Sequence, residues 1–236
     1  MTLENPFNDD ALENRGYLYS TNAPLSSRLA NQRLTDITLE SVQIKGKNVL
    51  DVGCGDGVYT LEIDAHGKPK SIIAGDVADR AIKVARNNSA GRNIHYMVNS
   101  AYELPFQANC FDVAILRGVL HHLDDPRQAI KESLRVADVV WVIEPNGYNP
   151  GLKFLEKFSA YHVEHGEKSY APHTLDQWVG KLGGKVTYRK WAGFVPMFCP
   201  DWVARLTKWL EPFVEHFPVI NKIGCAIYYF SASSKQ

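Results

Sequence analysis

An apolar strand that ends in an acidic, glycine-rich loop constrains this chain more than any other feature. The segment reads VLDVGCGDG from Val49 to Gly57, with three glycines in its last five positions. Glycine lets the backbone approach a ligand closely, and such a run is typical of a buried parallel strand whose carboxyl end delivers a loop to a ligand. The segment therefore predicts an α/β fold with a ligand site at the carboxyl edge of its sheet.

The charge of this loop selects among the ligands that α/β sheets bind. A dinucleotide site holds a pyrophosphate at a helix N-terminus. Here Asp51 and Asp56 supply two carboxylates, and the loop has no lysine or arginine to offset them. Two anions repel a phosphate and attract a cationic nucleoside. S-adenosylmethionine, with a sulfonium group, an ammonium group and no phosphate, fits these requirements.

Apolar runs and helical patterns alternate along the chain. We expect strands at 48–52, 70–76, 93–98, 111–116, 138–143, 185–191 and 224–231, and helices at 24–42, 57–65, 78–88, 126–136 and 174–182. This alternation predicts a Rossmann-like, doubly wound, mostly parallel seven-stranded sheet with helices on both faces. The run from Cys225 to Phe230 is apolar on both faces, so the last strand is expected inside the sheet.

Two segments interrupt the alternation. We expect a single domain over 1–236, with 1–44 as an N-terminal cap and helix and 45–144 as the core that binds the S-adenosylmethionine donor. Residues 145–173 and 192–223 follow the fifth and sixth strands, so they are expected as helical lid insertions that shape an acceptor pocket at the carboxyl edge.

The two insertions are rich in aromatic and other large apolar residues, which favours an apolar or ring-containing acceptor. The alternative is that these side chains only pack the lids onto the core. The large apolar residues of the two insertions are Tyr148, Phe154, Phe158, Tyr161, Tyr170, Phe194, Met197, Phe198, Trp202, Trp209, Phe213 and Phe217.

Further motifs follow the glycine loop in a fixed order. They read IIAGD at 72–76, SAYELPF at 100–106, FDVAIL at 111–116 and VLHHL at 119–123. Over roughly residues 45 to 145 the chain resembles the class I S-adenosylmethionine-dependent methyltransferases, in particular the small-molecule branch that includes quinone and sterol methyltransferases. The resemblance implies transfer of a methyl group from S-adenosylmethionine to a small molecule.

The resemblance also implies a donor site at the ends of the first four strands. The backbone from Gly53 to Gly55 would abut the donor, Asp51 would face its ammonium group, and Asp76 would accept hydrogen bonds from its ribose, unless Asp76 only caps the next helix. Ser100 stands where the family usually has aspartate, so adenine recognition lacks charge assistance. The expected donor-binding residues are Asp51, Gly53, Cys54, Gly55, Asp76, Val77, Asn99, Ser100, Ala101 and Arg117; for Arg117, a surface guanidinium is the alternative.

Two adjacent histidines, His121 and His122, follow the fourth strand. Either is a candidate base that takes a proton from an acceptor hydroxyl, with packing as the alternative. Related enzymes keep a histidine at the second place, which favours His122. Glu144 ends the fifth strand and is expected to orient a histidine, to bind the acceptor, or to bond loop amides. The expected acceptor-binding residues are Tyr17, Tyr161, His162 and Phe194.

Composition and spacing limit the other possibilities. His162 and His165 have helical spacing that suits a metal, but no third ligand follows a compelling spacing, so no metal is expected. The four cysteines are far apart, which favours a reducing cytoplasm. Formal net charge is zero, so nucleic acid is not expected as a partner. The start of the chain does not resemble a signal peptide, and no apolar run is long enough to span a bilayer.

The sequence thus predicts a cytoplasmic enzyme, monomeric or homodimeric, that methylates a hydroxyl of a small-molecule acceptor. Methylation of nitrogen or carbon, including an RNA base, and a non-catalytic donor-binding protein are the alternatives. Lid contact with a membrane is a further one. Trp202, Leu206, Trp209 and Phe213 share one helical face, but the charged residues around them are balanced in sign, so no stable membrane association is expected. Those charged residues are Asp201, Arg205, Lys208, Glu211 and Glu215.

Overall fold

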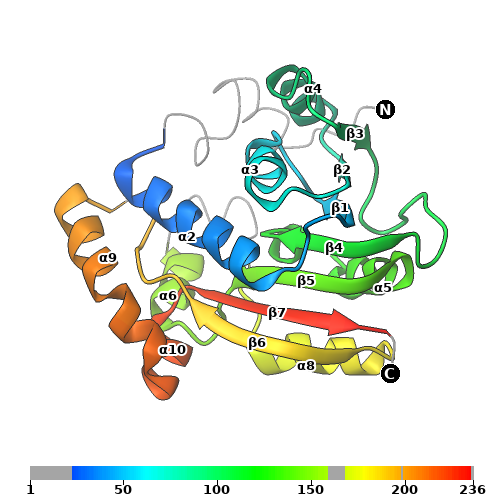
Figure 1. Ribbon diagram of the computed structural model, residues 1–236. Coiled ribbons are helices and arrows are strands. Elements are labelled where there is room, and N and C mark those ends of the chain that lie inside the picture. The colour runs from blue at the N-terminus through cyan, green and yellow to red at the C-terminus, as the bar shows by residue number, and fades with distance from the viewer. Residues whose placement is uncertain (1–22, 159–167, 198, 235–236) are drawn as a thin grey trace.

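A seven-stranded sheet forms the centre of the computed structural model, which describes residues 23–158, 168–197 and 199–234 (Figure 1). The strands are β1 (Asn48–Val52), β2 (Ser71–Asp76), β3 (Ile94–Val98), β4 (Phe111–Arg117), β5 (Ala137–Pro145), β6 (Lys185–Ala192) and β7 (Ile227–Ser233). Their order is β3-β2-β1-β4-β5-β7-β6, and β7 runs antiparallel to both of its neighbours. The expected doubly wound, mostly parallel sheet is confirmed, and so is the interior place of the last strand.

Helices flank the sheet where the periodic patterns predict them. They are α2 (Leu25–Ser41), α3 (Val58–Gly67), α4 (Asp79–Asn88), α5 (Pro126–Val136) and α8 (Pro172–Lys181). The ends of all the expected helices and strands agree with the observed ones to within three residues. The two insertions add α6 (Pro150–Phe158), α9 (Asp201–His216) and α10 (Pro218–Gly224), and a short 3-10 turn, η1 (Leu120–His122), follows β4.

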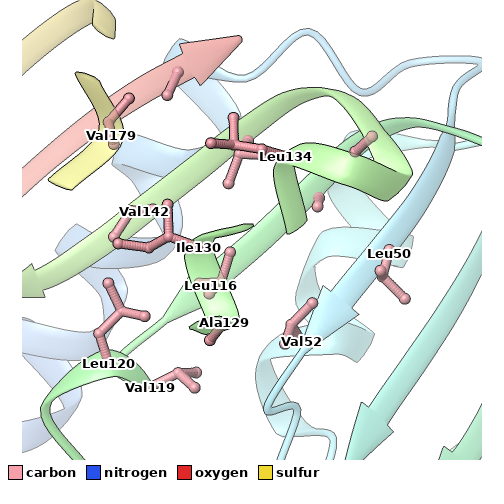
Figure 2. Close-up of a cluster of buried hydrophobic side chains, with 14 of the residues drawn as sticks. Leu50, Val52, Leu116, Val119, Leu120, Ala129, Ile130, Leu134, Val142 and Val179 are labelled. Atoms are coloured by element: carbon pink, nitrogen blue, oxygen red, sulfur yellow. The ribbon is translucent and has the colours of Figure 1, made fainter. Parts of the chain in front are cut away.

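Alternation along the strands divides the core into two layers. Leu50 and Val52 of β1 lie in one buried cluster with Ala129 and Ile130 of α5, and α8 closes the same layer (Figure 2). The residues between them face the other side, because successive side chains of a strand point to opposite faces. Val49 is buried there with side chains of α2, α3 and α4. Asp51 therefore projects toward the layer that contains α3.

The strand order places the glycine loop at the point where ligands bind in open α/β sheets. β1 and β4 are neighbours although β2 and β3 come between them in sequence. Connections leave these two strands in opposite directions, which opens a crevice outside their carboxyl ends. The loop after β1 and the turn η1 after β4 both lie at this edge. The location expected from the sequence is confirmed.

The helices α9 and α10 of the second insertion lie on the side toward which β4 and β6 point (Figure 1). An ion pair fixes α9 to α2, since Arg33 donates to both carboxylate oxygens of Glu215, at 3.0 and 2.6 Å. None of the helices in the described parts of the chain is both long and apolar enough to cross a bilayer.

Many aromatic side chains of the insertions face outward. The mostly exposed ones are Phe154, Phe158, Trp202, Trp209, Phe213 and Phe217. For these six, packing of the lid onto the core is therefore wrong as an explanation. That the insertions shape an acceptor pocket stays a prediction.

Candidate functional site

The glycine loop is packed tightly between β2 and the turn after β4. The amides of Gly53 and Cys54 both donate to the carbonyl of Gly75, at 2.8 and 3.1 Å. Gly53 has a φ of +76°, and a Cβ added there would stand 2.5 Å from Cγ2 of Val119. Only glycine meets both conditions. The loop is consequently in direct contact with the segment that carries His121 and His122.

Asp51 is a buried carboxylate beneath this loop. Its Oδ2 accepts a hydrogen bond from the hydroxyl of Thr60 at 2.6 Å. Burial raises the pKa of Asp51 to about 6, against the opposing effects of the Thr60 hydroxyl and of Arg117. Burial of an ionised carboxylate is costly unless a cation compensates it. A positively charged ligand group would provide that compensation.

Arg117 corrects one part of the electrostatic argument made from the sequence. The loop itself has no cation, but the guanidinium of Arg117 at the end of β4 lowers the pKa of Asp51 through its charge. Arg117 donates to Thr35 Oγ1 at 2.9 Å and to the carbonyl of Asn31 at 3.0 Å, and it lies 3.7 Å from the ring centroid of Tyr59. It is therefore no surface guanidinium: it ties α2 to the sheet, and the acidity of the loop is reduced without being cancelled.

Asp76 joins the end of β2 to the glycine loop. Its Oδ2 accepts from the amide of Gly55 and its Oδ1 from the amide of Ala78, both at 2.8 Å. Asp76 does not cap α4, because that helix begins after Ala78 without a side-chain cap. Burial raises its pKa although these amides oppose the shift. Val77, the next residue, is 61 % exposed and is accessible to a ligand at this edge.

Asn99, the first residue after β3, lies against the end of β2. Its amide donates to the carbonyl of Asp76 at 3.0 Å, and its Oδ1 occupies the place where a Cβ of Gly75 would stand, 1.8 Å away. The hydroxyl of Ser100 accepts from the amide of Tyr102 at 3.1 Å. Ser100 thus shapes the turn that carries Ala101, and the side chain of Asn99 lies against Gly75 of β2, whose carbonyl binds the glycine loop.

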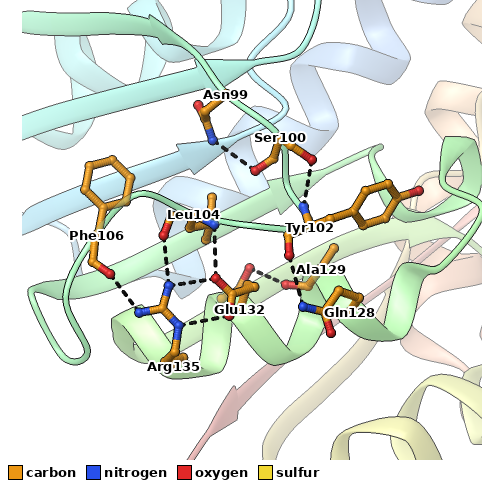
Figure 3. A network of polar contacts seen from close by, with 10 residues as sticks. Asn99, Ser100, Tyr102, Leu104, Phe106, Gln128, Ala129, Glu132 and Arg135 are labelled. Carbon is orange, nitrogen blue, oxygen red and sulfur yellow. Dashed lines mark hydrogen bonds and ion pairs between the residues drawn. The ribbon is translucent and has the colours of Figure 1, made fainter.

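Two charged side chains of α5 hold the segment after β3 in place (Figure 3). Glu132 accepts from the amide of Leu104 at 3.0 Å, and Arg135 donates to the carbonyls of Leu104 and Phe106 at 2.9 and 2.7 Å. Arg135 also pairs with Glu132 at 2.6 Å and lowers the pKa of that carboxyl. Sequence reasoning missed this clamp. Its signal was a glutamate and an arginine three apart on a predicted helix.

Glu144 binds the whole turn after β4. The side chain is 1 % exposed; Oε1 accepts from the amides of Val119 and Leu120, each at 2.8 Å. Oε2 accepts from the amide of His121 at 3.3 Å and lies 2.8 Å from His121 Nδ1. Both structural expectations for Glu144 hold together: it bonds loop amides and it orients a histidine. That histidine is His121, whose ring centroid lies 3.8 Å from that of His122 with the two ring planes tilted by 44°.

Of the four residues expected to bind the acceptor, the structure places one. Phe194 follows β6 at the carboxyl edge, and its amide donates to Oε2 of Glu211 on α9 at 3.0 Å. Tyr17, Tyr161 and His162 lie outside the described residues, as does His165.

The chain is similar to known proteins in the part that forms this site. Residues 50–139 match the family model described as methyltransferase domain. This part of the chain is a methyltransferase domain. The resemblance to the class I S-adenosylmethionine-dependent methyltransferases, drawn from the motifs, is confirmed for it.

Relatives of the methyltransferase domain include two quinone enzymes. The chain is 35 % identical over 95 residues to the ubiquinone biosynthesis O-methyltransferase of Coxiella burnetii, and this matched stretch covers 39 % of each of the two chains. It is 31 % identical over 121 residues to the ubiquinone/menaquinone biosynthesis C-methyltransferase of Idiomarina loihiensis, covering 49 % and 46 %. The chain thus spans less than half the length of each of these relatives.

A solved structure has a similar fold over nearly the whole chain. The magnesium protoporphyrin IX methyltransferase of Synechocystis PCC 6803, solved with bound S-adenosylhomocysteine, matches with a TM-score of 0.69 and 14 % identity over 97 % of this chain and 96 % of that one. At this identity the match establishes the fold.

The residues of the methyltransferase domain fit a cationic nucleoside donor. Gly53 leaves backbone where a side chain would clash, and three acidic residues, Asp51, Asp56 and Asp76, gather at the loop. Cys54 is buried, and burial raises the pKa of its thiol well above the ordinary value, so it is no nucleophile. Among residues 23–158, 168–197 and 199–234 no three His, Cys, Asp or Glu side chains form a metal-binding group.

Proposed function

We propose that the protein transfers the methyl group of S-adenosylmethionine to a hydroxyl oxygen of a small apolar or ring-containing molecule. The observation that carries the proposal is the contact between the glycine loop after β1 and the turn after β4. The buried carboxylate of Asp51 lies under a glycine loop, and Gly53 of that loop packs on Val119, within the turn that Glu144 and His121 form. A donor site and a proton-accepting site are thereby adjacent.

When bound, the donor supplies an activated methyl group on a sulfonium, which leaves as a neutral thioether. The chain supplies binding and orientation. Asp51 compensates the donor's positive charge, Asp76 fixes the glycine loop, and Asn99 and Val77 lie where the adenosine part would rest. Orientation of two reactants contributes up to about 7–11 kcal/mol when it is ideal.

His121 is the proposed base. Because the oxygens of Glu144 accept hydrogen bonds from backbone amides, its contact with Nδ1 is satisfied by the tautomer with hydrogen on Nδ1 and the proton-accepting lone pair on Nε2. Glu144 acts as a positioning residue, since its oxygens are engaged by the turn. His122, favoured by analogy, stays a second candidate. A positioned base contributes about 10²–10⁴ in rate when the acceptor is a hydroxyl.

Oxygen is proposed because a hydroxyl needs the base that the pair of His121 and Glu144 provides. One quinone relative is named for O-methylation and one for C-methylation, so carbon is the second candidate. The test is incubation with labelled donor and four acceptor classes: phenols, hydroquinones, amines and RNA. We expect label on phenol or hydroquinone oxygen. Label only on carbon, nitrogen or RNA would reject the proposal, and no label on any acceptor, with donor binding intact, would favour a donor-binding protein.

Binding of S-adenosylhomocysteine is expected to weaken in acid. Its ammonium group pairs best with ionised Asp51, whose pKa in the free protein is about 6. Affinity should be constant near pH 8 and fall below pH 6, approaching about tenfold per pH unit. The raised pKa of Asp76 acts in the same direction. Calorimetric titration from about pH 5 to 8 measures this; a flat profile would show that neither carboxylate takes part.

Loosening the clamp on α5 is expected to weaken donor binding without touching the donor. Arg135→Met removes the donors to the carbonyls of Leu104 and Phe106 and leaves Glu132 without its cation. We expect a loss of stability of about 1–3 kcal/mol and a several-fold rise in the donor dissociation constant. Lys131→Met, a neighbouring exposed cation on the same helix, is the control. Equal donor affinity in both variants would contradict a positioning role for the clamp.

We also propose a cytoplasmic location, a monomer or homodimer, and no nucleic-acid partner. The balanced net charge supports the last point. Light scattering on the purified chain tests the oligomeric state, a gel-shift assay with RNA tests the nucleic-acid proposal, and fractionation of cells that produce the protein tests its location.

A further inference from the structure

Three hydroxyl groups near the amino ends of α2 and α3 are buried and have no hydrogen-bond partner in the part of the chain that the structure describes. They belong to Ser26 and Ser27 in the first turn of α2 and to Tyr59 in the first turn of α3. Both serines are 0 % exposed. Buried polar groups without a partner are costly and uncommon in folded proteins. These hydroxyls therefore indicate a ligand that bonds to them.

The guanidinium of Arg117 lies between α2 and the first turn of α3. It donates to Oγ1 of Thr35 and to the carbonyl of Asn31 on α2, and it lies 3.7 Å from the ring centroid of Tyr59. Ser27, Asn31 and Thr35 follow one another at intervals of four residues and are all buried. Residues four apart lie on one side of a helix. Ser27 thus belongs to the side of α2 that Arg117 contacts.

The two helices place Ser27 at the edge of the sheet where ligands bind. Thr35 donates to Glu62 of α3, and Asn31, one turn before Thr35, is joined to the ring of Tyr59 by the guanidinium. Positions nearer the amino end of α2 therefore lie beside positions nearer the amino end of α3. Ser27, a further turn before Asn31, comes at the carboxyl edge of the sheet, because α3 begins there directly after the glycine loop.

Charges of both signs meet at the ends of β1 and β4, which are neighbouring strands. Burial raises the pKa of Asp51 and of Tyr59, and the charge of Arg117 lowers both. The phenol consequently keeps its proton and can donate it in a hydrogen bond. The carboxylate of Asp51 and the guanidinium of Arg117 thus lie within reach of one another's charge. An amino-acid group, which carries an ammonium and a carboxylate on one carbon, is complementary to such a pair.

We propose that Arg117, Tyr59 and Ser27 bind the carboxylate of the donor's amino-acid part. Asp51 then binds the ammonium group on the same carbon. A guanidinium only donates hydrogen bonds and both hydroxyls can donate, so the three side chains suit a group that only accepts. The inference rests on the proposed function, because it concerns the same donor. It makes these side chains the ones that distinguish S-adenosylmethionine from adenosine derivatives without a carboxylate.

The test is calorimetric titration of the full chain with three ligands. S-adenosylhomocysteine carries both the ammonium and the carboxylate, its decarboxylated analogue carries only the ammonium, and methylthioadenosine carries neither. We expect the unchanged protein to bind S-adenosylhomocysteine about ten- to hundredfold more tightly than the decarboxylated analogue. The comparison needs neither the acceptor nor turnover.

Three variants separate the contributions of the cation and of the hydroxyls. Arg117→Met should weaken binding of S-adenosylhomocysteine about tenfold or more, and binding of the decarboxylated analogue should stay equal or tighten, since a cation beside Asp51 opposes a bound ammonium. Tyr59→Phe keeps the ring under the guanidinium and removes only the hydroxyl. We expect it and Ser27→Ala each to weaken S-adenosylhomocysteine about three- to tenfold and to leave methylthioadenosine unchanged. Tyr96→Phe, which removes a buried tyrosine hydroxyl of β3, is the matched control and should bind as the unchanged protein does.

Several results would overturn the proposal. Equal binding of S-adenosylhomocysteine and its decarboxylated analogue by the unchanged protein is the first. An equal loss for both ligands in Arg117→Met is the second, since it would leave that side chain only its tie to α2. If Arg117→Met does not fold, the hydroxyl variants decide: undiminished binding by both Tyr59→Phe and Ser27→Ala, or an equal loss in Tyr96→Phe, would reject the carboxylate site. Failure of all three ligands to bind would reject the proposed function as well, whereas tight binding without preference for the carboxylate rejects only this inference.

Discussion

Replacing Asp51 with asparagine is expected to make the free protein more stable at pH 8 and to abolish tight donor binding. In the folded protein the pKa of Asp51 is about 6, against 3.8 as its ordinary value. As pH rises from about 4 to 6, the unfolded chain ionises this group before the folded one does, so stability falls over that range. Above pH 6 the folded protein bears a penalty of up to about 3 kcal/mol, which asparagine removes.

The stability that Asp51→Asn gains over the unchanged protein should appear over the same pH range, because it is the removal of this penalty. Asp51→Asn keeps an oxygen for the hydroxyl of Thr60, so little else changes. Denaturant unfolding at pH 8 should show the variant more stable by up to about 3 kcal/mol, and at pH 4 the two proteins should coincide. Asp112→Asn is the control of opposite sign, because the amide of Asn48 and Lys47 lower the pKa of Asp112. Equal stability of Asp51→Asn and the unchanged protein at pH 8 would contradict the raised pKa.

The donor affinity of the same variant should fall although its stability rises. Removing one partner of a buried ion pair costs about 3–5 kcal/mol. We therefore expect the affinity for S-adenosylhomocysteine to fall by about a hundredfold or more, and its dependence on pH below 6 to flatten. A variant that is more stable but binds the donor normally would show that Asp51 does not face the ammonium group. The carboxylate is thus expected to be retained for binding at the expense of stability.

Replacing Glu144 with glutamine is expected to reduce kcat by about 10²–10⁴ with a smaller effect on folding. The amide oxygen can still accept from Val119 and Leu120, but the NH₂ group meets two donors at His121, its amide and Nδ1–H. The imidazole would change tautomer to relieve this clash, which places hydrogen on the nitrogen that has to accept a proton. The donor dissociation constant should stay within a few-fold, since Glu144 does not contact the glycine loop.

Glu144→Ala separates the two roles of this side chain. It leaves three backbone amides and the His121 ring without their acceptor in a buried place, so the free energy of unfolding should fall by about 4 kcal/mol. His121→Ala should reproduce the loss of kcat without that loss of stability. If Glu144→Gln keeps kcat and the pH profile of the unchanged protein, the positioning role is wrong. If His122→Ala loses more activity than His121→Ala, the base is the second histidine.

Local patterns were sufficient to predict the fold and the place of the glycine loop. The switch between apolar runs and helical periodicity depends only on neighbouring residues, and it predicted every flanking helix and all seven strands. The placement of the candidate residues at one edge of the sheet followed as well, because parallel strands bring their carboxyl ends to one edge whatever the loops contain. The expectation that the last strand is interior rested on residues apolar on both faces, and β7 indeed lies between β5 and β6.

Contacts between distant segments were beyond such patterns. Arg117 reaches α2 across more than eighty positions and tempers the acidity of a loop that in sequence has no cation. The choice of His121 as the oriented histidine depends on Glu144, which lies on the next strand of the sheet. The outward position of Trp202, Trp209 and Phe213 is likewise a result of how α9 packs on the rest of the chain, since the sequence places them on one helical face without saying which way that face points.

The sequence by itself determined the alternating α/β order, the parallel sheet, and the class of ligand that an acidic glycine loop attracts, because these depend on residue type and short-range spacing. Only the tertiary structure decided which charges remain unbalanced, which histidine is held, and which aromatic rings face outward. Those properties depend on burial and on pairing between residues far apart in the chain, which sequence spacing does not encode.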